Sequence, residues 1–216
     1  LTVKSGGDRD QTTELARFNL EANGEPRLLG GEFLRRMESD LDEILAVVER
    51  AASPLGARPL LVGILPSLTQ SDLSLDAMSP SPRFPALNAA LSRLRGGDFS
   101  VLLRGADTLE TTHDSILMES ASTSFQLHLQ VDADEAAPLY NLAQLVTAPL
   151  LAAAVGSPLL FGKRLWQETR VALFERATDA RSEAQAVRGL RPRVSFGDAW
   201  VKESVLELMR DDALRF

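Results

Sequence analysis

The stretch Thr123-Ser124-Phe125-Gln126-Leu127-His128-Leu129-Gln130-Val131 carries the strongest structural pattern in the chain. Successive side chains of a β-strand point to opposite faces, so this alternation predicts a strand with one apolar and one polar face. On the polar face the imidazole of His128 lies between the carboxamides of Gln126 and Gln130. These groups can bind a metal or hold a ligand without adding charge. The alternative is a satisfied polar network on a sheet.

Residues 17–23 repeat the alternation and predict a second strand with a polar face. If the two strands share a sheet, Glu21 and His128 can converge on a divalent cation and approach the same cavity. The carboxylate would supply an oxygen ligand and the imidazole a nitrogen ligand. Without such a partner, Glu21 is better explained as a solvated strand residue.

The length and composition limit the function classes. A chain of 216 residues can bury one sizeable core, and we expect a single domain over residues 1–216. Its 23 basic and 30 acidic residues give a net charge of -7, which argues against nonspecific nucleic-acid binding. The lack of cysteine excludes disulfides, thiolate metal sites and a cysteine nucleophile. It also fits a reducing compartment, and with no export signal in view we expect a cytoplasmic location.

The most apolar region, residues 137–161, is interrupted by proline, glycine and amide side chains. It therefore lacks the uninterrupted apolar stretch of roughly 20 residues that crosses a bilayer. We expect a buried helix that starts near Ala133 and ends before Gly156, and no membrane association.

The remaining patterns alternate between helical and extended segments, which indicates an α+β fold. Helices are predicted at 32–52, 86–94 and 200–210, strands at 60–65 and 99–103, and a loop at 66–85. Residues 114–119 and 123–131 are close enough in sequence to form a hairpin, and residues 169–174 fit either a strand or a helix.

Several stretches together resemble the type 2 glutamate-cysteine ligase family, the carboxylate-amine ligases. They are Phe18-Asn19-Leu20-Glu21, Gly63-Ile64-Leu65-Pro66, residues 123–131, Tyr140-Asn141-Leu142-Ala143-Gln144, residues 157–166 and Glu168-Thr169-Arg170. The resemblance covers roughly residues 12–210. It implies a glutamine-synthetase-like fold, in which helices back an antiparallel sheet and the concave face of that sheet binds ATP and divalent cations.

The chemistry implied by this resemblance is ATP-dependent amide-bond formation through an acyl phosphate. Mg²⁺ would be held by Glu21 and His128, and Arg170 would contact the phosphate or acyl phosphate. The other implied cofactor-binding residues are Gln126, Gln130, Arg104, Lys163 and Arg164; the last three have a surface or structural role as their alternative. The implied partners are a small carboxylic acid such as glutamate and an amine, and a homo-oligomer is compatible with them.

Two departures from the family pattern stand out. The family's first strand carries an early Glu-x-Glu pattern, whereas Leu1 to Gln11 contains no glutamate, so we expect this chain to lack that strand. Gly156 replaces the asparagine that often precedes Ser-Pro in relatives. Two other functions therefore stay open: a noncatalytic relative that binds nucleotide or amino acid as a sensor or partner subunit, and a metal-dependent hydrolase that uses His113 and His128.

Overall fold

The computed structural model describes residues 14–192 and 194–213. Its main elements are α1 (Phe33–Ala52), α2 (Arg83–Arg95), β1 (Phe99–Arg104), β2 (Thr108–His113), α3 (Ala136–Ala153), β3 (Leu159–Leu160), β4 (Lys163–Arg164), α4 (Thr169–Ala177), α5 (Glu183–Val187) and α6 (Leu206–Ala213). Short 3-10 helices connect them: η1 (Ser53–Leu55), η2 (Gln70–Leu73), η3 (Leu75–Ala77) and η4 (Ile116–Ala121). This mixture confirms the α+β class. The expected absence of a first strand concerns residues 1–11, which lie outside the described residues.

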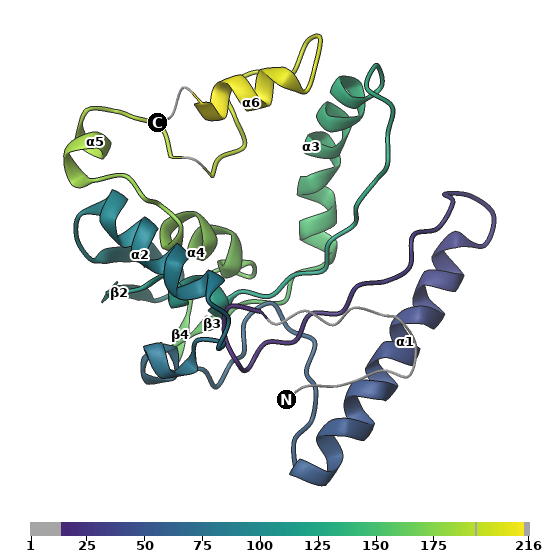
Figure 1. Cartoon of the computed structure of the whole chain (residues 1–216), viewed down its shortest axis with the longest axis horizontal. Helices are drawn as coiled ribbons and strands as arrows, with labels where there is room; N and C mark the ends of the chain where they lie inside the picture. The colour runs from purple at the N-terminus through teal and green to yellow at the C-terminus, as the bar shows by residue number, and fades with distance from the viewer. Residues whose placement is uncertain (1–13, 193, 214–216) are drawn as a thin grey trace.

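The core forms around the antiparallel β1–β2 hairpin, in which Phe99 pairs with His113. Alternate residues of β1 are buried, as the two-residue period of a strand requires. The hairpin packs with η4 and α4 into one apolar cluster (Figure 1). Its fully buried side chains include Phe99, Val101, Leu103, Leu117 and Leu173.

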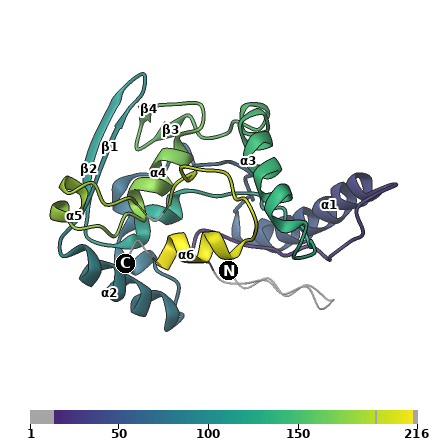
Figure 2. The ribbon, with the colours of Figure 1, turned by 90° about the horizontal axis from the view of Figure 1, so that it is seen from above.

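Two of the predicted helices and one predicted strand are confirmed. Apolar residues at three- and four-residue spacing form α1, and α2 ends at Gly96, whose φ of 72° is in the left-handed region that favours glycine. The predicted strand at 99–103 is β1. Figure 2 shows the β1–β2 hairpin and α1 at opposite ends of the molecule.

Other predicted strands are wrong. Residues 123–131 pair with no described strand, and residues 17–23 form a turn followed by irregular chain. The predicted strand at 60–65 is reduced to an isolated bridge between Ile64 and Ser122, and η4 replaces the first half of the predicted hairpin. Alternation shows which side chains share a face, but it does not specify the partner strand. The described sheets are two-stranded, so the concave sheet stays a prediction.

The long apolar segment is a helix, α3, but the prediction that it is buried is wrong. Leu142, Leu145 and Leu150 are all more than half exposed, and burial is confined to Ala136 and Ala137 in its first turn. The reason is that α3 projects away from the β1–β2 cluster (Figure 1). By length and composition α3 could cross a membrane, with 11% of its apolar window buried. The absence of membrane association therefore stays a prediction.

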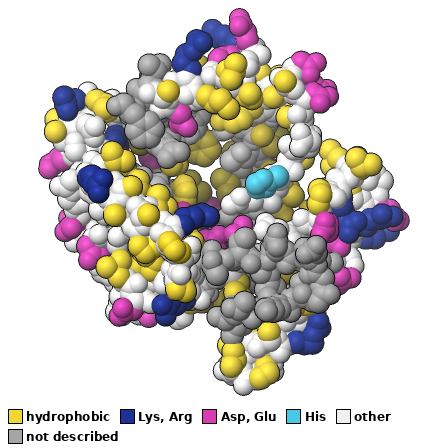
Figure 3. Space-filling model, viewed as in Figure 1, with side chains coloured by type: hydrophobic (Ala, Val, Ile, Leu, Met, Phe, Trp, Pro, Cys, Tyr) yellow, Lys and Arg dark blue, Asp and Glu magenta, His cyan; other side chains and the backbone are white. Residues whose placement is uncertain are grey.

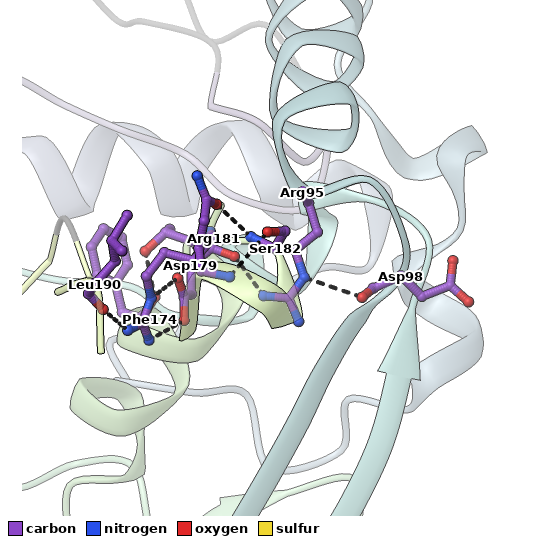
Figure 4. Close-up of polar contacts among 9 residues, drawn as sticks. Arg95, Asp98, Phe174, Asp179, Arg181, Ser182 and Leu190 are labelled. Carbon is purple, nitrogen blue, oxygen red and sulfur yellow. Dashed lines mark hydrogen bonds and ion pairs between the residues drawn. The ribbon is translucent and has the colours of Figure 1, made fainter. Parts of the chain in front are cut away.

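Polar contacts fix the C-terminal part of the chain. Nη1 of Arg95 donates to the carbonyl of Asp179 over 2.7 Å, and Arg181 binds the carboxylate of Asp179 at 2.7 and 2.8 Å (Figure 4). Burial alone would raise the pKa of Asp179, but the hydrogen bonds from Arg181 lower it below its ordinary value. The amide of Asn141 on α3 exchanges two hydrogen bonds with the backbone of Val201, at 2.7 and 3.0 Å.

Candidate active site

Segments that are far apart in the sequence meet at Gly63. Its N–H donates to the carbonyl of Gly156 over 2.9 Å, and its carbonyl accepts from the N–H of Thr123 over 2.9 Å. A Cβ atom on Gly63 would lie 3.0 Å from Cβ of Ser157 and 3.2 Å from Cδ of Arg170. Because glycine has no side chain, the segments can approach this closely. We call this meeting point the Gly63 junction.

An ion pair holds Arg170 at the Gly63 junction. Its Nε and Nη2 donate to Oε1 of Glu168, and its Nη1 donates to the carbonyl of Thr123 over 2.8 Å. The other carboxylate oxygen of Glu168 accepts from Oγ of Ser157 at 2.9 Å and from the N–H of Gly156 at 3.1 Å. The Arg170 side chain is 20% exposed. A permanent positive charge is therefore fixed at the start of residues 123–131 and is still reachable from solvent.

Three glutamates gather near the other end of residues 119–123. The carboxyl of Glu14 hydrogen-bonds with that of Glu21, and Glu119 on η4 lies close enough to Glu14 for their charges to repel. Nδ2 of Asn19 donates to the carbonyl of Ser120 over 2.7 Å, which ties the turn before Glu21 to η4. We call Glu14, Glu21 and Glu119 the glutamate cluster.

Two members of the glutamate cluster hold their protons more tightly than an ordinary glutamate. Burial, followed by the charge of Glu14, raises the pKa of Glu119. Burial, followed by the hydrogen bond with Glu21, raises the pKa of Glu14. Both effects disfavour the ionised form, so a nearby cation would stabilise the cluster at neutral pH.

Three of the predicted cofactor-binding residues surround one turn: Arg104, Lys163 and Arg164. The N–H of Asp107 donates to the carbonyl of Arg164 over 2.7 Å, and the N–H of Arg164 donates to Oδ2 of Asp107 over 2.8 Å. Gly105 packs so closely on Leu165 that a Cβ would lie 2.5 Å from the backbone carbon. The three cationic residues are exposed. Their roles in cofactor binding stay predictions.

Residues Gln126, His128 and Gln130 are exposed on the unpaired segment. Nε2 of His128 lies 3.2 Å from Oε1 of Gln126, and Nε2 of Gln126 donates to Oγ of Ser124 over 3.4 Å. Alternate side chains thus share one side, as predicted. The prediction that His128 and Glu21 lie on one sheet is wrong, because neither segment is a strand. Their roles as metal ligands, like those of the two glutamines in cofactor binding, stay predictions.

His113 has a local structural role. It is buried at the end of β2, and its Nδ1 lies 3.1 Å from Oγ of Ser115. A depression of about 350 Å³ lies beside it, between η2 and the end of β2, and is lined by residues that include Gln70, Ser71 and Asp98. None of the predicted site residues lines this depression, so it does not mark the predicted site.

Comparison with known families decides what kind of protein has this arrangement. The model of glutamate-cysteine ligase family 2 matches residues 2–195, which include the Gly63 junction and the glutamate cluster. The chain belongs to glutamate-cysteine ligase family 2. The resemblance drawn from the sequence motifs is therefore confirmed. Neither the curated proteins nor the solved structures give a match.

The glutamate cluster fits the divalent cation that a ligase of this family would use. Carboxylate oxygens are preferred ligands of Mg²⁺, and a cation would offset the raised pKa of Glu14 and Glu119. Among residues 14–192 and 194–213, no three acidic, histidine or cysteine side chains are spaced to hold a metal by themselves. This is compatible with Mg²⁺, which is usually bound by one or two carboxylates together with substrate phosphates and water.

Sequence reasoning missed two members of the cluster, Glu14 and Glu119. Glu119 carried a usable signal, because it is the one charged residue in the run Ser115 to Ser122, most of which is buried. A carboxylate in such a run needs a partner or a function. Glu14 has no comparable local signal, since it is recognised only by its contact with Glu21.

Proposed function

We propose that the chain is an ATP-dependent carboxylate-amine ligase, similar to glutamate-cysteine ligase, that forms an amide bond through an acyl phosphate. Membership of glutamate-cysteine ligase family 2 supports a ligase of this kind. The observation that carries the proposal is the placement of Arg170 and the glutamate cluster at opposite ends of residues 119–123. A fixed cation and a divalent metal are the charges needed to bring two anions together.

In the proposed reaction, a carboxylate oxygen of the first substrate attacks the γ-phosphorus of ATP, and the bond to the β,γ-bridging oxygen breaks to release ADP. The amine then attacks the acyl carbon, and inorganic phosphate leaves with the bonding electron pair. When bound, Mg²⁺ neutralises charge on the phosphate oxygens. Glu14, Glu21 and Glu119 would hold it, with His128 as a further candidate ligand.

Arg170 has donors left for a substrate. A guanidinium carries five N–H groups, and the contacts with Glu168 and Thr123 use three of them. One N–H on each terminal nitrogen therefore remains for the two-point contact with a phosphate or acyl phosphate that we assign to Arg170.

The remaining assignments follow from the family. Gln126 and Gln130 would hold the nucleotide or the amino acid, and Arg104, Lys163 and Arg164 would contact its phosphates. These positions would lie along a concave, glutamine-synthetase-like sheet in a cytoplasmic enzyme whose substrates are a carboxylic acid such as glutamate and an amine. Support for this arrangement comes from the family match.

The decisive experiment measures ADP release with Mg²⁺-ATP across a panel of amino acids and amines. We expect ADP release that requires both an acid and an amine, together with one amide product per ADP. Glu119→Gln should abolish it, whereas Glu110→Gln, the same change at an exposed position on β2, should not. ATP binding without ADP release from any pair would refute the ligase proposal and favour the noncatalytic sensor.

A second measurement tests the metal without relying on activity. Because the pKa of Glu14 and of Glu119 is raised, Mg²⁺ should displace protons from the glutamate cluster. Titration of the chain with Mg²⁺ in weakly buffered solution near pH 6 should therefore acidify it. The acidification should be smaller for Glu119→Gln than for Glu110→Gln, and equal acidification by both would move the metal away from the cluster.

A further inference from the structure

Residues 125–131, Phe-Gln-Leu-His-Leu-Gln-Val, form a near palindrome centred on His128. Reading outward from His128, leucine matches leucine, glutamine matches glutamine, and phenylalanine matches valine. In an antiparallel pair of identical strands, each residue faces the one at the same distance on the other side of the centre. Two copies of this segment would thus pair each of these side chains with one of the same kind.

The backbone of this segment is available for pairing. Thr123, just before it, is fixed at the Gly63 junction by Gly63 and Arg170. From residue 124 to 131, the backbone N–H and C=O groups make no hydrogen bond within the described part of the chain. A segment with free backbone groups is a template for strand addition.

The side chains of the segment favour a second copy of the same chain as its partner. Residues 123–131 contain no Asp, Glu, Lys or Arg, so two copies meet without repulsion between like charges. Phe125, Leu127 and Leu129 are 60%, 61% and 64% exposed and share one face. On the other face, paired carboxamides of Gln126 and Gln130 can each donate and accept a hydrogen bond.

A cover for the apolar face is also close in sequence. A two-stranded ribbon is only marginally stable in water unless a helix packs on it. The helix α3 begins at Ala136, shortly after the segment, and exposes Leu142, Leu145, Val146 and Leu150. Hydrophobic side chains accordingly spread over the surface of the molecule (Figure 3).

We propose that the chain forms a two-fold symmetric dimer in which residues 123–131 of two copies pair as antiparallel strands centred on His128, with α3 of each copy against the apolar face of the ribbon. The dimer is independent of the proposed ligase activity. An isologous contact of this kind closes on itself, because the same surface is used by both copies.

Single cysteines test the register, since the natural chain has none. His128→Cys should place two thiols directly opposite, with Cα atoms about 4.5–5.5 Å apart, which permits a disulfide. Gln126→Cys is the matched control: its two copies would be four residues apart along the strands, about 13 Å, too far to bridge. Under mild oxidation we expect a covalent dimer for His128→Cys only. Equal cross-linking of both variants, or of neither, would overturn the proposed register.

Charge pairs test the interface without a covalent bond. Gln126→Lys with Gln130→Lys would place like charges opposite at both glutamine pairs, whereas Gln126→Lys with Gln130→Glu would place opposite charges there. By sedimentation equilibrium, the second variant should dimerise at least about tenfold more tightly than the first. Equal dissociation constants, or a chain that is monomeric at roughly 100 μM before any substitution, would refute the dimer. Circular dichroism checks that both variants are folded.

Discussion

Replacement of Arg170 by lysine should weaken both the fold and the reaction. The guanidinium makes two hydrogen bonds to Glu168 and one to the carbonyl of Thr123. An ammonium has a single nitrogen and cannot span these acceptors, so Arg170→Lys loses about two charge-assisted bonds. At about 1–1.5 kcal/mol each, given partial exposure, the free energy of unfolding should fall by about 2–3 kcal/mol. For a chain of this size, the melting temperature should fall by about 4–12 °C.

Urea unfolding followed by circular dichroism measures this loss. The matched control is Arg176→Lys, the same change at an exposed position of the same helix, which should shift the free energy by less than about 0.5 kcal/mol. At equal concentrations of folded protein, Arg170→Lys should also lower ligation roughly 10²-fold. Equal stability of the two variants would refute the structural reasoning. Unchanged turnover in folded Arg170→Lys would remove Arg170 from the site.

Three further predictions concern stability. Glu119→Gln should raise the free energy of unfolding at pH 7 by about 0.5–2 kcal/mol, because the raised pKa of Glu119 penalises its ionised form; the gain should vanish below about pH 4 in urea titrations. Asp179 has a lowered pKa, so its stabilisation is present above the unfolded-state pKa and is lost as the pH falls through the folded-state value; Asp179→Asn should cost about 1 kcal/mol at pH 7 and little at pH 2. Gly105→Ala should cost about 1–3 kcal/mol by thermal melts, since its Cβ would overlap the backbone of Leu165, whereas Gly97→Ala should cost less.

Local periodicity predicts the elements whose stabilising contacts are close in sequence. The helical spacing of Leu34, Leu41 and Val48 indicates α1, and alternation in residues 99–103 indicates β1, whose partner β2 follows after a short turn. Residues 123–131 have an equally clear alternation, but a strand also needs a partner, and no feature of the sequence identifies one. The burial of α3 was mispredicted for the same reason, because apolar composition does not say what covers a helix.

The candidate site divides in the same way. Glu21 and Arg170 were accessible from motifs, and the structure places each of them in a polar cluster. The partners of these residues were not accessible, since Glu119 and Glu168 act through contacts between distant segments. Physical reasoning from sequence thus identified residue types and faces, whereas the pairing of charges required three-dimensional proximity.

The Gly63 junction also bears on how the chain folds. Its hydrogen bonds join residues 60 positions apart, between Gly63 and Thr123, and 47 positions apart, between Thr123 and Arg170. Each bond requires the closure of a long loop before any energy is recovered, and such non-local contacts slow folding. We therefore infer that α1 and the β1–β2 hairpin, whose contacts are local, form early, and that the junction closes late. Arg170 would then acquire its position only in the last stage of folding, so partially folded chains would be inactive even when most of their helices are formed.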